Sequence, residues 1–290
     1  MMERQIRRLS GHVVVGVDDS PAAAEAVTVA AEEAARAALP LEIVHAVDPA
    51  RYRDRSGPAA YTDAHTLVDR AAEAARRLAP WLDVETTVVH SAPDDALLGA
   101  SDTAALVVVG SRGLGALAGA VLRSVGASHV ARSRCPVLIV PPGLPAASAP
   151  PRPVLVGVSG PACRPAVEAA LRQAALRGTR LTALHAWSVP VRSVGFSAAA
   201  RGAVSAERVR ARARLAEVLE PLRGKEPGVR VRESVVRDAP GRALVEASGA
   251  AGLLVVGARQ RPPGPGAHIG PVMHALLHRT RCPLLVVPVV

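Results

Sequence analysis

The stretch VVVGVDDSPAAAEAVTVAAEEAARAALPLEIVHAV (residues 13–47) recurs in altered form as PVLVGVSGPACRPAVEAALRQAALRGTRLTALHAW (residues 153–187). The ends of the two copies also match, since SRCPVLIVP (residues 133–141) resembles TRCPLLVVP (residues 280–288). Solenoid repeats have units of roughly 20–50 residues, and this period is far longer. The sequence therefore predicts a duplicated domain.

Composition sets the size and the core of each copy. Two copies share 290 residues, which leaves each copy within the usual size of a single domain. Apolar residues make up 49% of the chain and aromatic residues only 2%. We therefore expect cores built from Val, Leu, Ile and Ala.

The net charge of +10 and the sequence pI of about 11.0 come almost wholly from arginine, because Lys225 is the only lysine. One interpretation is an anionic partner, such as nucleic acid or a phosphate ligand. The other is a compositional bias towards Arg, Ala, Gly and Pro, with the arginines in solvent. We favour the bias, because two Trp, two Tyr and one Phe leave little surface for stacking bases, and we expect no nucleic-acid partner.

The number of cysteines and the length of the apolar runs indicate in which cellular compartment the protein is expected. Three cysteines, an odd number without a secretory segment, argue against a disulfide framework. Cys135 and Cys282 stand before the last strand of each copy, where buried thiols are expected. No apolar run approaches the ~20 residues of a membrane helix. We expect a cytoplasmic protein without a membrane partner.

A proline-rich segment, PPGLPAASAPPRP (residues 141–153), separates the copies and is typical of an extended linker. We expect a first domain at 1–142, a linker at 143–152 and a second domain at 153–290.

Val-rich runs alternate with Ala-rich helical stretches in both domains. Ser20 is the expected N-cap of the first helix, with Pro21 at its first position. The first domain has expected strands at 12–18, 41–47, 84–90, 105–110 and 136–140, helices at 21–38, 62–78, 93–100 and 121–132, and a polar loop at 51–61. The second domain has expected strands at 154–158, 180–187, 229–236, 252–257 and 283–288, and an arginine-rich amphipathic helix at 201–223.

Strands that are apolar on both faces and alternate with helices predict an α/β fold with a parallel sheet. Each domain would have five strands with helices on both faces, in a flavodoxin-like order with right-handed crossovers. Ligands of such folds bind beyond the carboxyl ends of the strands, at the switch point of the strand order.

Two strand ends of the first domain carry candidate ligand-binding residues. Asp18 follows the first strand, and Gly110, Gly113 and Gly115 follow the fourth, in GSRGLG. Glycines let a backbone approach a ligand closely, and the helix that begins near Ser124 offers free N–H groups suited to phosphate. The pattern fits a nucleotide site, and it also fits a tight connection without a ligand.

These motifs resemble the universal stress protein family, in its form with two domains on one chain. The resemblance lies in VVVGVDDSPAAAEAV, in VHAV and in VVVGSRGLG…SVGASHVARSRCPVLIVP. It implies an adenine-nucleotide alpha-hydrolase-like fold, ATP as ligand, alone or with Mg²⁺, and a homodimer or an intrachain pseudo-dimer paired through the terminal strands. By this resemblance, the adenine and ribose side is lined by Gly16, Asp18 and Ala46, the ribose and phosphates by Gly110, Ser111, Arg112, Gly113, Leu114 and Gly115, and the terminal phosphates by Arg123, Ser124 and Val125.

One position departs from the motif of the ATP-binding members, which is G-x-x-G, nine residues, then G and Ser or Thr. Arg123 stands at the third glycine. An arginine there blocks the site if a glycine is required, or contributes a cation beside the phosphates if the position is an ordinary helix start.

The second domain departs further from the motif. Ser159 replaces the counterpart of Asp18, Gln260 replaces the second glycine, and Pro271 follows Gly270 where Ser is expected. A proline removes a hydroxyl and an N–H together. We expect this domain not to bind ATP in the family's way and to serve for packing instead.

Weaker patterns remain. His274, His278 and Cys282 recur every four residues, but no fourth ligand supports a metal site. His45 and His185, at matched strand ends, are interpreted as structural. No P-loop, GxSxG or HExxH motif occurs, so we expect a regulatory nucleotide-binding protein and not an enzyme. The alternative is a ligand-free interaction scaffold.

Overall fold

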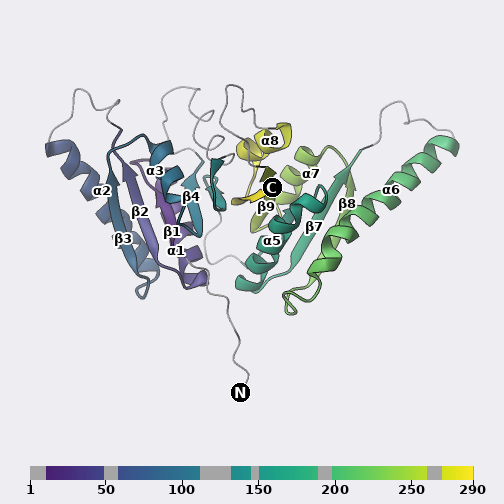
Figure 1. Ribbon diagram of the computed structural model, residues 1–290, viewed down its shortest axis with the longest axis horizontal. Helices are drawn as coiled ribbons and strands as arrows, with labels where there is room; N and C mark the ends of the chain where they lie inside the picture. Colours follow the sequence, from purple (N-terminus) through teal and green to yellow (C-terminus); the bar gives the residue numbers. More distant parts are fainter. Residues whose placement is uncertain are drawn as a thin grey trace, which may run out of the picture. The chain divides into compact units, whose positions relative to one another are not determined.

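The computed structural model describes residues 11–48, 58–111, 132–144, 150–188, 198–259 and 270–289. They form two compact units (Figure 1). Of the described residues, the first unit contains 11–48, 58–111 and Ser133–Pro142, and the second contains those from Gly143 onward. Each unit has an α/β architecture around one run of parallel strands.

The first unit confirms the expected fold class and closely matches the expected strand positions. Its strands are β1 (Val13–Gly16), β2 (Leu41–Ala46), β3 (Val84–Val89), β4 (Leu106–Gly110) and β5 (Val137–Val140). They pair in parallel in the order β3-β2-β1-β4-β5. Its described helices are α1 (Pro21–Ala37), α2 (Pro58–Leu78) and α3 (Pro93–Ala100).

The strand order differs from the flavodoxin-like order 2-1-3-4-5, because β3 pairs with β2 and not with β1. Helices α1 and α2 pack against each other on one face, so the sheet grows outward from β1 through β2 to β3. Helix α3 instead packs on β1 and β2 from the other face as the chain returns to β4. The switch point of the strand order therefore lies between β1 and β4.

The start of α1 follows from its sequence. The Ser20 side chain accepts a hydrogen bond from the N–H of Ala23 at 3.2 Å, and Pro21 occupies the first turn, as the sequence predicts. The helix turns small residues toward the sheet, which lets it lie close to the buried valines of β1 and β4. Its buried apolar residues are Ala22, Ala23, Ala26, Val27, Ala30, Ala31 and Ala34.

The second unit repeats this plan with strands in the order β10-β9-β6-β7-β8, all parallel. The strands are β6 (Val154–Gly157), β7 (Leu181–Trp187), β8 (Val231–Arg237), β9 (Leu253–Arg259) and β10 (Leu284–Val289). The helices are the short η2 (Pro161–Cys163), α5 (Arg164–Leu176), α6 (Ala198–Leu219), the short η4 (Glu220–Leu222), α7 (Pro240–Ser248) and α8 (Pro271–Arg279).

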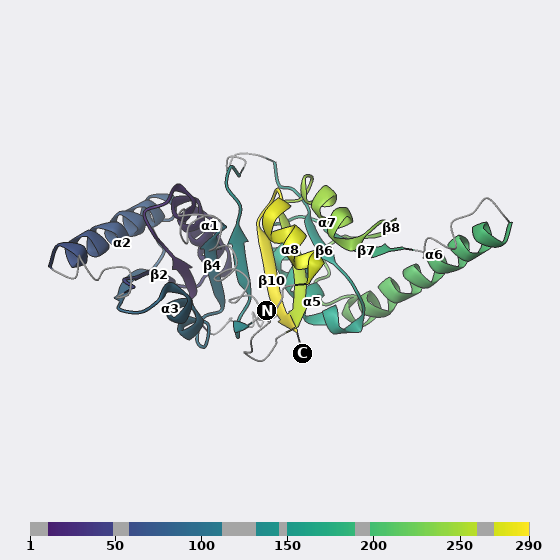
Figure 2. The same ribbon diagram turned by 90° about the horizontal axis from the view of Figure 1, so that it is seen from above.

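Two local predictions need correction. Helix α2 begins at Pro58, inside the expected loop at 51–61, because proline suits the first turn of a helix. Among the described side chains of helix α6, those of residues 201–219, the buried apolar ones all lie in its C-terminal half, at Ala211, Leu215, Val218 and Leu219. Residues 201–210 include no buried side chain, because this half of the helix extends past β7 and β8 of its own unit (Figure 2). The expected amphipathic character is therefore confined to its second half.

Within the described ranges, no helix combines the length and the apolar character that a bilayer crossing requires.

Candidate functional site

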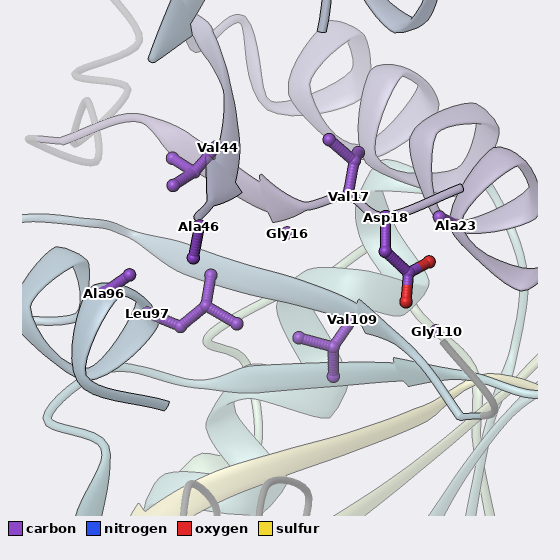
Figure 3. Close-up of a pocket in the computed structure, with 10 residues that line it drawn as sticks. All are labelled: Gly16, Val17, Asp18, Ala23, Val44, Ala46, Ala96, Leu97, Val109 and Gly110. Atoms are coloured by element: carbon purple, nitrogen blue, oxygen red, sulfur yellow. The ribbon is translucent and has the colours of Figure 1, made fainter. Parts of the chain in front are cut away.

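A hollow opens at the carboxyl edge of the first unit, beside the switch point (Figure 3). Strand ends β1, β2 and β4 form its floor, and α1 and α3 flank it. Its empty volume of about 380 Å³ includes a part open to solvent. Its described lining is Gly16, Val17, Asp18, Ala23, Val44, Ala46, Ala96, Leu97, Val109 and Gly110.

Asp18 is the only charged residue of this described lining. Its Oδ1 accepts hydrogen bonds from the backbone N–H of Ser20 at 3.1 Å and from the Ser20 hydroxyl at 2.5 Å. Oδ2 has no partner within the described part of the chain. The carboxylate turns toward the hollow, near Gly110 (Figure 3). One oxygen is thus fixed by the start of α1, and the other can accept hydrogen bonds from a ligand.

The two glycines of the lining are required by packing. A Cβ at Gly110 would lie 2.7 Å from the Ala22 carbonyl oxygen, in the first turn of α1. A Cβ at Gly16 would lie 3.0 Å from Cδ1 of Leu97, in α3. From the sequence, we expected Gly110 to let the backbone approach a ligand. In the structure, the absence of a side chain at Gly110 lets α1 lie against the end of β4.

The apolar wall of the hollow was largely missed by sequence reasoning. Ala96 and Leu97 of α3, together with Val44 and Val109, complete the wall. Leu97 is only 3% exposed. The sequence placed this short helix correctly, but only the crossing of α3 to the second face of the sheet brings its leucine beneath Gly16.

Five of the predicted site residues lie in the described chain. Gly16, Asp18, Ala46 and Gly110 line the hollow together. Ser111 directly follows β4, where its N–H bonds to the Val140 carbonyl at 2.8 Å. The other predicted contacts lie outside the described residues, as does most of the expected helix at 121–132: Arg112, Gly113, Leu114, Gly115, Arg123, Ser124 and Val125.

The matched histidines have a structural role. His45 Nδ1 donates to the Val17 carbonyl at 2.8 Å, and His185 Nδ1 donates to the Val158 carbonyl at 2.7 Å. Because a carbonyl can only accept, Nδ1 carries the proton in both rings. Each bond ties the second strand of its unit to the residue just after the first strand.

The cysteines before β5 and β10 are buried, as expected. Cys135 is 6% and Cys282 2% exposed. Burial raises the pKa of both thiols, and that of Cys282 reaches about 12. At neutral pH these thiols are protonated and behave as small core side chains.

The corresponding edge of the second unit has different chemistry. Ser159, at the place of Asp18, has its hydroxyl 3.0 Å from the thiol of Cys163, so two side chains satisfy each other there. Pro271 opens α8 without a side-chain cap, which removes one N–H from that helix start. Gln260 lies outside the described residues.

The His274 and His278 rings lie 4.5 Å apart between centroids. No group of three or more His, Cys, Asp or Glu side chains in the described ranges could hold a metal ion.

Comparison with known proteins agrees with the duplicated fold. The model of the universal stress protein family matches residues 10–141 and again 151–288. The chain is 36% identical to Universal stress protein Rv2005c of Mycobacterium tuberculosis, over 94% of this chain and 96% of that protein. It is 35% identical to Universal stress protein Rv2623 of the same species, over 94% and 95%.

A solved structure supports the same fold. The crystal structure of a universal stress protein from Archaeoglobus fulgidus superimposes with a TM-score of 0.72 at 17% identity, covering 97% of both chains. With two family matches that together span most of its length, the chain belongs to the universal stress protein family as a member with two tandem domains.

Proposed function

We propose that the first domain binds an adenine nucleotide, ATP in the first place, and that the protein is a stress-response regulator without a committed catalytic activity. One observation carries this proposal. The Asp18 carboxylate, with one oxygen unoccupied, stands at an otherwise apolar hollow between the ends of β1 and β4.

The lining suits the two halves of a nucleoside. Ala46 and Ala96, which are partly exposed, offer an apolar surface for a flat base. Asp18 Oδ2 is an acceptor for a ribose hydroxyl or an exocyclic amino group. A carboxylate repels phosphate, so the polyphosphate must lie away from Asp18, and the glycine-rich sequence after Ser111 is its natural binding segment by family resemblance.

A magnesium ion would enter with the phosphates. The described lining offers one carboxylate, and Mg²⁺ is usually held by one or two carboxylates together with phosphate oxygens. The proposal therefore treats Mg²⁺ as part of the ligand and gives it no site of its own.

Under this proposal, the two domains have different roles. In the second domain, the Ser159 hydroxyl already pairs with Cys163, and no carboxylate stands at that place. We therefore propose that nucleotide binds to the first domain alone, and that the second domain contributes packing or contacts with another chain.

Calorimetric titration of the full chain with ATP tests this function. We expect one ATP per chain and at least a tenfold weaker affinity in Asp18→Ser, which copies the residue of the second domain. The neighbouring Asp19 is exposed, so Asp19→Asn is the matched control and should bind as the unmodified protein does. Ser159→Asp should not create a second site.

The rival function is a ligand-free scaffold of the same fold. No binding at millimolar ATP, or equal binding by Asp18→Ser, would leave the scaffold as the better account. A slow ATPase is a separate possibility, and phosphate release that persists in both Asp18→Ala and Gly113→Val would come from a contaminant.

A further inference from the structure

Because the chain contains two copies of one domain, the charges of corresponding segments can be compared. The two domains differ in charge, since residues 1–142 have 14 basic and 17 acidic residues and residues 153–290 have 20 basic and eight acidic residues. Corresponding segments of the two domains show where this difference lies. Residues 62–90, which contain most of α2 and all of β3, have three basic and five acidic residues. The corresponding residues 201–237, with α6 and β8, have ten basic and five acidic residues. The net charges are therefore −2 and +5.

The inversion extends to single matched positions. Leu41 pairs with Val84 in the first unit as Leu181 pairs with Val231 in the second. One residue further, Glu42 pairs with Glu85, but Thr182 pairs with Arg232. A carboxylate pair at the outer strands of one unit is thus replaced by a hydroxyl and a guanidinium in the other. The two corresponding surfaces therefore differ in the sign of their charge.

The basic α6–β8 surface consists of the Arg and Lys side chains of residues 201–237, and half of them have no acidic partner. Glu207 pairs with Arg210 at 3.2 Å and with Arg214 at 3.5 Å. Five exposed arginines make no ion pair within the described chain: Arg208, Arg212, Arg230, Arg232 and Arg237.

The arrangement along α6 is regular. Arg201, Arg208 and Arg212 are separated by seven and four residues, which places them on one side of the helix. At 1.5 Å per residue they span about 16 Å. This part of α6 extends past the sheet of its unit (Figure 2), and residues 201–210 include no buried side chain. The helix therefore presents arginines without a covering layer.

The chemistry of this surface favours phosphate over other anionic partners. Nine of its ten basic residues are arginine, whose planar guanidinium binds phosphate oxygens in pairs. A membrane-surface helix needs an apolar face with large side chains, but Val209 is the only large exposed hydrophobic residue of α6 among the described side chains. A protein interface would usually have aromatic anchors, and residues 201–237 contain no aromatic residue.

We propose that the basic α6–β8 surface of the second domain binds the phosphate backbone of double-stranded DNA without sequence preference. A bare helix 10–12 Å across matches the major groove, which is about 12 Å wide. The scarcity of aromatic residues disfavours single strands, which are held by stacking. The surface is separate from the hollow of the first domain, so its binding does not depend on ATP.

Fluorescence anisotropy with a 20-base-pair duplex tests the proposal on the full, nuclease-treated chain. We expect binding that weakens steeply with NaCl, with a slope of about −4 in log affinity against log salt if four or five phosphates are contacted. Arg208→Gln/Arg212→Gln should reduce this slope by about 2 and weaken binding roughly tenfold at 100 mM NaCl.

The matched control removes the same charge from the corresponding helix of the first domain. Arg70 and Arg77 are exposed on α2, and Arg70→Gln/Arg77→Gln should change the affinity by less than about twofold. Circular dichroism and thermal melting establish that both variants fold. Arg230→Gln/Arg232→Gln on β8 is the second test pair and should also weaken binding.

Three outcomes would overturn the proposal. Equal losses in the α2 and α6 variants would assign the binding to net charge alone. Absence of duplex binding at 50 mM NaCl would remove nucleic acid as the partner. Binding to anionic lipid vesicles without binding to DNA would make the surface a membrane contact.

Discussion

The Asp18 carboxylate accepts a hydrogen bond from the Ser20 hydroxyl at 2.5 Å, and the oxygen of the same hydroxyl accepts one from the N–H of Ala23 at 3.2 Å. The proposed ligand carboxylate and the N-cap of α1 thus form one chain of hydrogen bonds. The residue that starts the helix also orients the only described charge in the hollow. The orientation of the proposed ligand carboxylate and the stability of the α1 start therefore depend on the same hydroxyl.

Removing the Ser20 hydroxyl should destabilise the start of α1. We expect Ser20→Ala to lower the free energy of unfolding by about 1 kcal/mol, because an N–H of the first turn loses its acceptor. Urea unfolding followed by circular dichroism measures this. Ser20→Thr, which keeps the hydroxyl, should recover most of the stability, and equal losses in both variants would contradict the capping role.

Gly110 should not tolerate a side chain. A methyl group there would lie 2.7 Å from the Ala22 carbonyl oxygen, so Gly110→Ala should destabilise the protein by about 1–3 kcal/mol, in the range of overpacked cores. Gly99, inside α3, has no atom within 4 Å of the corresponding position. Gly99→Ala should therefore be neutral or stabilising, by up to about 1 kcal/mol. Comparing the urea midpoints of the two variants is the measurement, and a neutral Gly110→Ala would be inconsistent with this packing.

The C-cap residue of α1 has a strained backbone conformation, and a glycine adopts the same conformation at the corresponding place in the second domain. Ala38 has a left-handed conformation, with φ 53° and ψ 46°, while Gly178 has φ 58° at the corresponding place after α5. Because an L-residue with a Cβ loses roughly 1–2 kcal/mol in this region, Ala38→Gly should stabilise the first domain by about 0.5–1 kcal/mol after the added entropy of the unfolded chain. Gly178→Ala should destabilise the second domain by a similar amount, and thermal melting of both variants checks the opposite signs.

Cys282 should make the stability fall in alkali. Its pKa is raised by burial to about 12, above the ordinary value of a thiol in the unfolded chain. The folded state then holds a proton that the unfolded state releases, so stability is lost as the pH rises from about 9 towards 12. At pH 10 the loss is about 1 kcal/mol.

Urea unfolding at pH 8 and pH 10 tests this dependence. The Cys282→Ala variant should lose about 1 kcal/mol less of its free energy of unfolding between pH 8 and pH 10 than the unmodified protein does. The native thiol should also resist alkylation at pH 8 and react after unfolding. Rapid labelling of Cys282 in the folded protein would show that it is not buried.

The sequence by itself determined the duplication, the α/β class, most strand positions and the start of α1. These follow from local patterns, since Val-rich runs such as residues 13–15 favour buried strands and Ser20-Pro21 favours a helix start. It also singled out Asp18 and Gly110, because residues at the carboxyl ends of parallel strands share one edge, whereas Gly16 and Ala46 were assigned through the family resemblance.

Only the tertiary structure decided which segments share a face or a neighbour. The strand order, the placement of Leu97 beneath Gly16 and the contact of Gly110 with Ala22 depend on crossovers between distant segments. The opposite charge of the α2–β3 and α6–β8 surfaces became meaningful only once β3 and β8 proved to be corresponding outer strands. Periodicity reports what each residue prefers locally, whereas these relationships arise from packing between elements far apart in the chain.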